Sequence, residues 1–404
     1  MTVDSVKSDE NFELNFNKLF KYSVFSLNFN RSHPEIKKDK KWVVQFILMY
    51  GLYLVPSSSI LYSTIVHEIK IDLTKAVANM SLMVMYSVVT LKYALLVMHR
   101  EVILSLINTV RKDYVVALTL PEEEKALVVT YAKKGSWIAK IWLYISICTS
   151  LVFPFESFYL TFYYYVMGET QAVELYHLIY PEPIERIKFK VVPFLILYGL
   201  LYYFDFFSAT MYVGVVPLAP AFMLHACGQL EMLKMRMDKL FSEEVKSLQD
   251  RKMRLNIIVK QLQDIYTFVE KIQTGFKLLY ELTLKGTAIM LPIITFSLID
   301  TFKRGSISME FIVLFWGAIL LSYCPCYYGD MLIERAESFR TAVYMSGWEG
   351  VWDKRARTTI LVIMTRTFRT VAIRTMFRNL CLDALTDVYH QAYAIFNFLL
   401  AAWS

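Results

Sequence analysis

Residues 37–66 read KKDKKWVVQFILMYGLYLVPSSSILYSTIV, a short basic run followed directly by a long apolar stretch. The apolar part, from Trp42 to Val66, exceeds the ~20 residues that a helix needs to cross a hydrocarbon layer at ~1.5 Å per residue. Lysines beside a first span stay in the cytosol during insertion. The stretch therefore predicts a transmembrane helix that begins on the cytoplasmic side, after a cytoplasmic amino-terminal segment.

Six further apolar stretches of similar length follow along the chain. The composition is also that of a membrane protein, because 56% of the residues are hydrophobic and only 20% are charged. We therefore predict an all-α integral membrane protein with seven transmembrane helices and cytoplasmic helical extensions. The predicted spans are Trp42 to Val66, Ala76 to Met98, Ser136 to Tyr165, Val191 to Met223, Leu282 to Phe302, Glu310 to Tyr328 and Leu380 to Ala402.

The lysines and arginines fall almost wholly on one side of the predicted membrane. Of the 43, 33 lie before the first span or in the connections after the second, fourth and sixth spans, whereas 7 lie in the other connections. Because basic connections stay in the cytosol, the amino terminus is predicted inside and the carboxyl terminus outside. The net charge of +7 is explained by loops that face anionic membrane lipid, so no nucleic-acid partner is predicted.

Two long connections on the cytoplasmic side predict folded helices. Apolar residues recur at helical spacing between Leu255 and Ile272, so two amphipathic helices are expected to extend the fourth and fifth spans inward. Two more are expected from Glu334 to Met345 and from Thr358 to Phe377. Their apolar faces predict an anchor region that packs between subunits. The predicted divisions are 1–41 (cytoplasmic), 42–224 (four spans with a ligand pocket), 225–281 (anchor), 282–328 (two spans), 329–379 (anchor) and 380–404 (last span).

The last span carries polar or small side chains at spacings of four, three, four, three and four, which places them on one helix face. Since a carboxylate in hydrocarbon is costly, this face is predicted to border an aqueous path in which its aspartates attract cations. Two alternatives stay open: the aspartates begin the helix, where its dipole favours acidic groups, and the His and Asn form interhelical hydrogen bonds. The stripe consists of Asp383, Asp387, His390, Ala394, Asn397 and Ala401.

Other charges inside the predicted spans divide by depth. Lys92, Lys140 and Lys285 lie within about two turns of a cytoplasmic boundary, so their side chains are expected to reach the surface by snorkelling. Asp205 lies near the middle of the fourth span among aromatic residues. It is predicted to be a functional or pairing residue, with a partner that the sequence does not identify.

Aromatic and sulfur side chains gather in the outer halves of the middle spans. Pockets for small organic ligands are mostly apolar and aromatic with a few polar groups, and methionine adapts to irregular ligand shapes. The alternative is that these side chains lie at the membrane interface or in helix packing. The predicted ligand-binding residues are Met80, Met83, Tyr86, Phe153, Ser157, Phe158, Tyr198, Tyr202, Phe296, Phe311 and Phe315.

Several function classes are excluded by missing motifs. The chain contains no HExxH, paired CxxC, GxSxG, Walker or dinucleotide-binding motif, and its six histidines form no ligand cluster. No catalytic residue, cofactor or metal site is therefore predicted. A G-protein-coupled receptor is excluded because its orientation is the reverse of that predicted here, and the NPxxY and DRY motifs are absent.

The run His225-Ala226-Cys227-Gly228-Gln229-Leu230 resembles the H-x-x-G-Q-L run of insect odorant receptors. The stretch from Cys381-Leu382-Asp383 through Leu399-Leu400 is similar to that family's carboxyl-terminal helix, and the inverted seven-helix topology also agrees. The related gustatory receptors are the second choice, since this chain lacks their TYxxxxxQF ending. A non-conducting membrane binding or scaffold protein is the third.

The resemblance implies an odorant-gated, non-selective channel for monovalent and divalent cations that needs no G protein. This chain would be the odour-tuning subunit, in a heterotetramer with the odorant co-receptor at the plasma membrane of olfactory neurons. Small volatile odorants would bind among the outer halves of the second to sixth spans, and the last span would line the pore. Alignment with the family places a hydrophobic gate at Phe398 and near Ala402.

Overall fold

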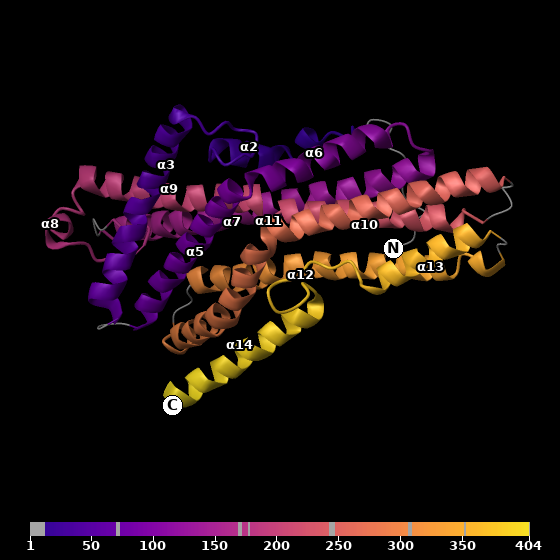
Figure 1. Cartoon of the computed structure of the whole chain (residues 1–404). Coiled ribbons are helices and arrows are strands. Elements are labelled where there is room, and N and C mark those ends of the chain that lie inside the picture. Colours follow the sequence, from indigo (N-terminus) through magenta and orange to yellow (C-terminus); the bar gives the residue numbers. More distant parts are fainter. Residues whose placement is uncertain are drawn as a thin grey trace.

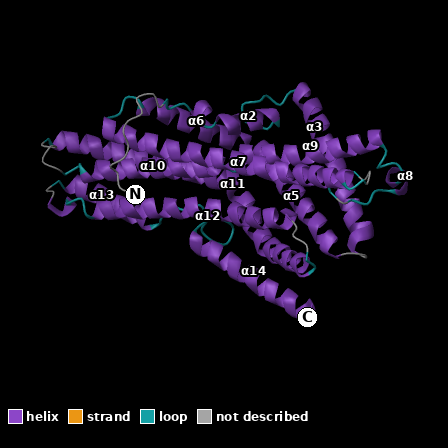
Figure 2. Cartoon of the chain, turned by 180° about the vertical axis from the view of Figure 1, so that it is seen from behind, coloured by secondary structure: helices purple, strands orange, loops and turns teal. Residues whose placement is uncertain are grey.

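The computed structural model describes residues 13–69, 73–168, 172–176, 178–241, 247–305, 309–350 and 353–403. These residues form an almost wholly helical chain, as Figure 2 shows, which confirms the predicted all-α fold. The elements are α1 (Phe16–Leu19), α2 (Lys21–Phe29), α3 (Lys40–Tyr62), η2 (Ser63–Glu68), α5 (Leu73–Met98), α6 (Arg100–Ala117), α7 (Glu122–Val166), α8 (Glu182–Glu185), α9 (Val191–Val215), α10 (Leu218–Asp238), α11 (Leu248–Lys303), α12 (Met309–Tyr344), η3 (Trp348–Gly350), α13 (Lys354–Phe368) and α14 (Leu382–Trp403).

Six segments of the described chain are long and apolar enough to cross a membrane. The seventh predicted span is α14, whose 22 residues also reach the required length, although its first half is polar. The six segments are Lys40–Glu68, Asn79–Met98, Glu122–Val166, Val191–Asp238, Leu248–Lys303 and Phe311–Gly350.

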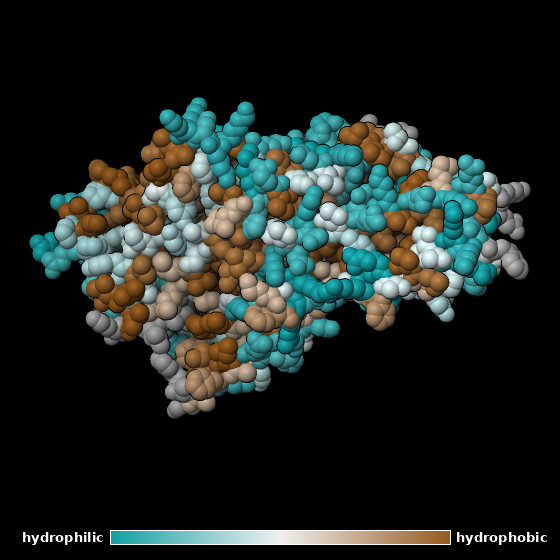
Figure 3. All heavy atoms as spheres, in the orientation of Figure 1, coloured by the Kyte–Doolittle hydropathy of each residue, from teal (hydrophilic) through white to brown (hydrophobic). Residues whose placement is uncertain are grey.

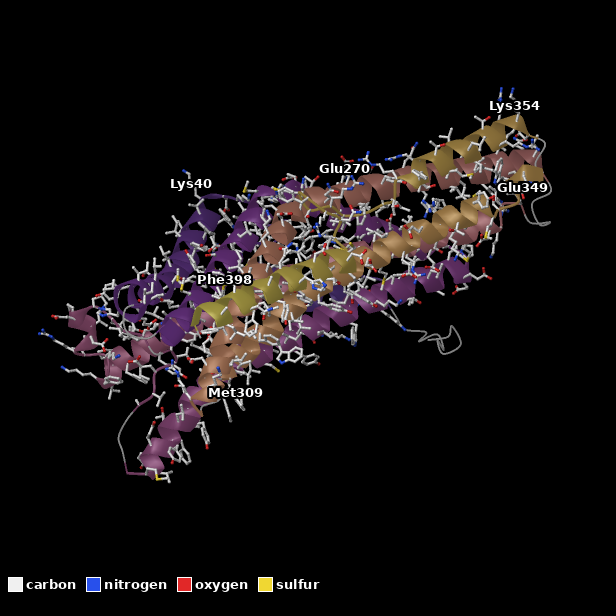
Figure 4. All side chains as sticks on the ribbon, turned by 90° about the horizontal axis from the view of Figure 1, so that it is seen from below. Lys40, Glu270, Met309, Glu349, Lys354 and Phe398 are labelled. Carbon is white, nitrogen blue, oxygen red and sulfur yellow. The ribbon has the colours of Figure 1, made fainter. Side chains whose placement is uncertain are left out.

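Helices α7, α10, α11 and α12 run along the long axis of the molecule, and α14 diverges from them toward the carboxyl terminus (Figure 1). In Figure 4, Met309 and Glu349 mark the two ends of the α12 region, and Lys354 lies beside Glu349. Lys40, at the start of α3, lies well short of that end. The long helices therefore extend past the level at which α3 begins, as predicted for the anchor region.

Hydropathy differs between the two ends of the molecule. Hydrophobic side chains gather over α3 and α5, whereas hydrophilic side chains are more frequent over α10 and α13 (Figure 3). On α3, Val44, Ile47 and Leu48 are exposed, and on α7, Phe155 and Phe158 are exposed. Such apolar faces suit contact with lipid tails, because hydrocarbon imposes no cost on an exposed apolar side chain.

The predicted fourth span is interrupted. It was expected to be one helix from Val191 to Met223, but α9 ends at Val215 and α10 begins at Leu218. The break falls at Pro217, which has no backbone N–H to donate to the helical ladder. Helix α10 therefore contains both the end of the predicted fourth span and the start of the helical extension that was predicted after it.

The helix expected from Thr358 to Phe377 was predicted too long. Helix α13 ends at Phe368, and a tight connection then leads to α14. In this connection the Thr375 N–H donates to the Arg378 carbonyl, and the Leu380 N–H donates to the Ile373 carbonyl, both at 2.8 Å. These bonds satisfy backbone groups that a continued helix would have paired differently.

The His225–Leu230 run lies where α6, α7, α10 and α11 meet. His225 Nε2 lies 2.9 Å from Asp113 Oδ2 on α6, and Gln229 Oε1 accepts a hydrogen bond of 2.9 Å from Gln261 Nε2 on α11. A Cβ at Gly228 would lie 3.1 Å from the Tyr131 ring on α7. The run is therefore a packing motif that joins four helices.

We expect Gly228→Val to destabilise this junction. The added side chain would press on Tyr131, and overpacking of this kind costs about 1–3 kcal/mol. The unfolding temperature of the purified chain in detergent measures the effect. Gly199→Val is the matched control, because Gly199 on α9 is exposed and its Cβ would meet nothing within 4 Å. Equal unfolding temperatures for the two variants would contradict the packing role of Gly228.

Candidate functional site

A cavity of about 210 Å³ lies between α5, α7, α9, α11 and α12. These five helices meet in the left half of Figure 1. Each contributes to the wall at positions that repeat every three or four residues, such as Asp205, Ser208, Ala209 and Tyr212 on α9. Residues at this spacing share one helix face. The cavity thus lies within the second to sixth predicted spans. Its wall includes Trp142 and Leu282, near the ends of their spans that were predicted to be cytoplasmic, so it lies deeper than the outer halves in which the sequence placed the ligand pocket.

The wall is mainly apolar, with a small set of polar groups. Leu82, Val84, Met85 and Val88 form the α5 side, and Met290 belongs to the α11 side. The polar residues on the wall are Ser81, Ser146, Thr149, Ser150, Asp205, Ser208, Tyr212, Thr283 and Thr287. An apolar surface with few polar groups is the usual composition of a site for a small organic molecule.

Asp205 is 6% exposed and lies on the cavity wall. The Tyr176 hydroxyl donates a hydrogen bond to Asp205 Oδ1, which identifies the partner that the sequence left open. The Tyr176 ring packs edge-to-face against Phe153, with ring centres 5.2 Å apart. Both Asp205 and Phe153 line the cavity, and Tyr176 contacts both of them. Tyr176 therefore packs behind this part of the wall.

Tyr176 belongs to the connection between α7 and α8, which is fastened to the helices. Ser157 Oγ on α7 donates to the Val173 carbonyl at 2.8 Å. The Lys188 ammonium lies 2.8 Å from Glu174 and 2.7 Å from Glu185. Burial lowers the pKa of Lys188, but its hydrogen bonds with the two glutamates raise the pKa by more, so that it stays above the ordinary value. The charged lysine therefore holds this connection in place.

Lys92 does not reach the surface, so the prediction that it snorkels was wrong. Its side chain is 1% exposed, and its Nζ lies 3.2 Å from the centre of the Tyr212 ring. No described residue accepts a hydrogen bond from this ammonium. Lys92 lies one helical turn beyond Val88 on α5, so it faces α9 behind the inner end of the cavity wall. By contrast, Lys140 and Lys285 are exposed, as predicted.

We expect Lys92→Met to stabilise the fold. Burial of a charge without a hydrogen-bond acceptor is costly, and contact with the Tyr212 ring offsets only part of that cost. Methionine keeps most of the volume, so the free energy of unfolding should rise by about 1–3 kcal/mol, the cost of a buried polar group without a hydrogen bond. The unfolding temperature of the purified chain measures this, with the exposed Lys140→Met as control. A lower unfolding temperature for Lys92→Met would show that the ammonium stabilises the bundle.

Of the predicted ligand-binding residues, Phe153 lines the cavity. Met80 and Phe158 are exposed, Ser157 binds the Val173 carbonyl, and Tyr198 lines a smaller pocket beside Lys188. Tyr202 is exposed, Phe311 is buried, and the remaining four are half-buried: Met83, Tyr86, Phe296 and Phe315. The sequence reasoning missed the face with Ser81, Val84, Met85 and Val88. A signal for the cavity was available on α7, α9 and α11, where small, hydroxyl or other polar residues recur at helical spacing along the wall.

Helix α14 buries one face and exposes the other. Ala384, Leu385, Val388 and Ala392 are buried where α14 packs on α11 and α12. The polar stripe lies on the opposite face. Asp383, His390 and Asn397 are exposed, Asp387 is half-buried in an ion pair with Arg378, and Phe398 is 72% exposed and labelled in Figure 4. The side chain of Ala402 lies outside the described residues.

Comparison with known proteins identifies the family. The family model described as 7tm Odorant receptor matches residues 72–393, which is most of the chain. The chain belongs to the 7tm odorant receptor family. This confirms the resemblance seen in the sequence, sets the gustatory alternative aside and places the receptor in a family of receptors rather than enzymes.

Solved structures show the same fold as this odorant receptor. The structure of the insect olfactory receptor OR5 from Machilis hrabei matches with a TM-score of 0.76 and 16% identity, over 95% of this chain and 98% of that chain. The structure of the same receptor in complex with eugenol matches with a TM-score of 0.74 and 16% identity, over 96% and 98%. No curated protein matches the chain.

Proposed function

We propose that this odorant receptor is the ligand-binding subunit of an odorant-gated, non-selective cation channel. It binds a small volatile molecule in the cavity between α5, α7, α9, α11 and α12. The observation that carries this proposal is an apolar cavity of about 210 Å³, with few polar groups, inside the spans of an odorant receptor. The related OR5 has been solved in complex with eugenol, a molecule of the expected kind.

Apolar contact can supply most of the affinity. Each buried CH₂ group contributes about 0.8 kcal/mol, so a volatile of modest size reaches micromolar binding with few hydrogen bonds. Phe153 is the predicted contact residue that also lines the cavity. For most apolar ligands, the order of affinity should therefore follow how well the shape of the ligand fits the cavity. The other ten predicted contact residues remain proposals, and ligand ranking in variants such as Tyr198→Ala tests them.

The polar stripe on α14 is proposed to line the ion path in a heterotetramer with the odorant co-receptor. It faces away from the helices of its own chain, so a partner or water must cover it. Asp383 and Asp387 would attract monovalent and divalent cations, while Phe398 and Ala402 would form the gate. A ligand that binds the open arrangement more tightly shifts the equilibrium toward it, by no more than its differential affinity.

Coexpression with the odorant co-receptor and current recording test this proposal. We expect odorants from a broad panel to evoke a cation current that neither subunit alone reproduces. Surface expression without current across the panel would instead favour a non-conducting binding or scaffold subunit. Tags at both termini test the topology at the plasma membrane: the carboxyl-terminal tag should be accessible on intact cells, and the amino-terminal tag only after permeabilisation.

A further inference from the structure

Several polar groups on the cavity wall can accept a hydrogen bond from a ligand. Asp205 is the only carboxylate among the described residues that line the cavity. An ionised carboxylate accepts hydrogen bonds at two oxygens with about four lone-pair sites and donates none. The Tyr176 hydroxyl uses one of these sites on Oδ1. The wall therefore presents a buried carboxylate whose oxygens can accept a hydrogen bond from a ligand.

The threonine hydroxyls on the wall add to this bias. Thr149 Oγ1 donates to the Ser146 carbonyl at 3.1 Å, and Thr283 Oγ1 donates to the Leu279 carbonyl at 2.7 Å. Thr287 Oγ1 donates to the Thr283 carbonyl at 2.9 Å. A hydroxyl has a single proton, so each of these oxygens can only accept a hydrogen bond from a ligand while its own bond lasts.

We propose that the ligand carries a hydrogen-bond donor on an apolar body, as an alcohol, a phenol or an amine does, and that Asp205 selects for this donor. The inference rests on the proposed ligand-binding role of the cavity, but not on conductance. An ether or ester oxygen has no proton to donate and would lie beside a carboxylate that repels its lone pairs. A site whose buried polar groups pair with a ligand donor rejects the analogue that lacks it.

The first test uses the wild-type chain and matched ligand pairs. 2-Phenylethanol, 3-phenylpropan-1-ol and hexan-1-ol are each compared with their methyl ethers, by the shift in unfolding temperature of the purified chain and by currents of the coexpressed complex. We expect the alcohol of each bound pair to act at roughly 10- to 100-fold lower concentration, the range for a hydrogen bond to a charged group. A chain that binds none of the alcohols, or that prefers the ethers, overturns the proposal.

The second test changes the carboxylate. Asp205→Asn should weaken the alcohols by roughly tenfold or more and leave the ethers within about twofold. Glu156→Gln is the matched control, because it makes the same change on α7 away from the cavity wall. Equal weakening of alcohols and ethers would overturn the proposal. If Asp205→Asn does not fold, the wild-type ligand pairs still decide it.

The two readouts separate this inference from the channel proposal. Thermal stabilisation by alcohols that depends on Asp205, without any evoked current, would support donor selection and contradict conductance. Currents that do not distinguish alcohols from ethers would support the channel and contradict donor selection.

Discussion

Gly317→Phe is expected to raise, by roughly 100-fold or more, the concentration at which each odorant that activates the wild type acts on the complex. Gly317 lies on α12 and lines the cavity, and a Cβ placed there would meet nothing within 4 Å. A phenyl ring can therefore enter the empty volume of about 210 Å³ without displacing the backbone. A ligand that loses burial of four CH₂ groups loses about 3 kcal/mol, so the effective concentration should rise roughly 100-fold or more.

The fold should survive this change, which separates loss of binding from loss of structure. We expect the unfolding temperature of Gly317→Phe to equal or exceed that of the wild type, because the ring fills a cavity. Gly199→Phe on the exposed face of α9 is the control for adding a phenyl group to a span, and it should respond normally. An unchanged odorant response in Gly317→Phe would mean that the ligand binds elsewhere.

Much of the fold follows from the sequence because membrane insertion depends on simple quantities. Length and hydropathy locate the spans, and the distribution of basic residues predicts their orientation. The helical extension through α11 follows from the spacing of Leu255 to Ile272, whose apolar residues are buried against neighbouring helices. The end of α13 at Phe368 was missed, because hydrogen bonds within the following connection decide it.

The depth of a residue within its predicted span follows from the sequence. The direction in which its side chain points is harder to predict. Lys92 has the depth of a snorkelling lysine, yet it points between α5 and α9 toward Tyr212. Asp205 was recognised as unusual, while its partner Tyr176 comes from a connection that is 29 residues away along the chain. The ligand-binding residues were chosen by type, whereas the cavity wall depends on which face of each helix meets its neighbours. Only Phe153 satisfies both conditions.

A close backbone contact fixes where α14 begins. Gly329 on α12 is buried, and a Cβ at this position would lie 2.2 Å from the carbonyl oxygen of Leu380. Leu380 is held on its other side by the bond from its N–H to the Ile373 carbonyl. On α11, Glu281 Oε2 accepts a hydrogen bond of 2.9 Å from the Met376 N–H. The connection before α14 is thus fastened to α11 and passes directly over a glycine of α12.

Gly329→Ala is therefore expected to abolish the odorant-evoked current while ligand binding persists. The methyl group must push the backbone of Leu380 away by about 1 Å, since ordinary contacts begin near 3.4 Å. The start of α14 would move with the backbone of Leu380. This movement would change the register in which Ala384 and Val388 pack against α11 and α12. In the proposed channel this displaces the polar stripe in every copy of the subunit, so even a small shift should close or misalign the ion path.

On α12 the cavity wall ends at Leu321, about two helical turns before Gly329, so stabilisation of Gly329→Ala by the activating odorant should match that of the wild type. Gly199→Ala makes the same chemical change in open space on α9, away from the cavity wall, and should conduct normally. Normal currents from Gly329→Ala would show that the connection can yield without moving α14, and that the contact with Leu380 does not position the pore. Loss of both current and odorant-induced stabilisation would instead show that Gly329 supports the whole bundle rather than the placement of α14.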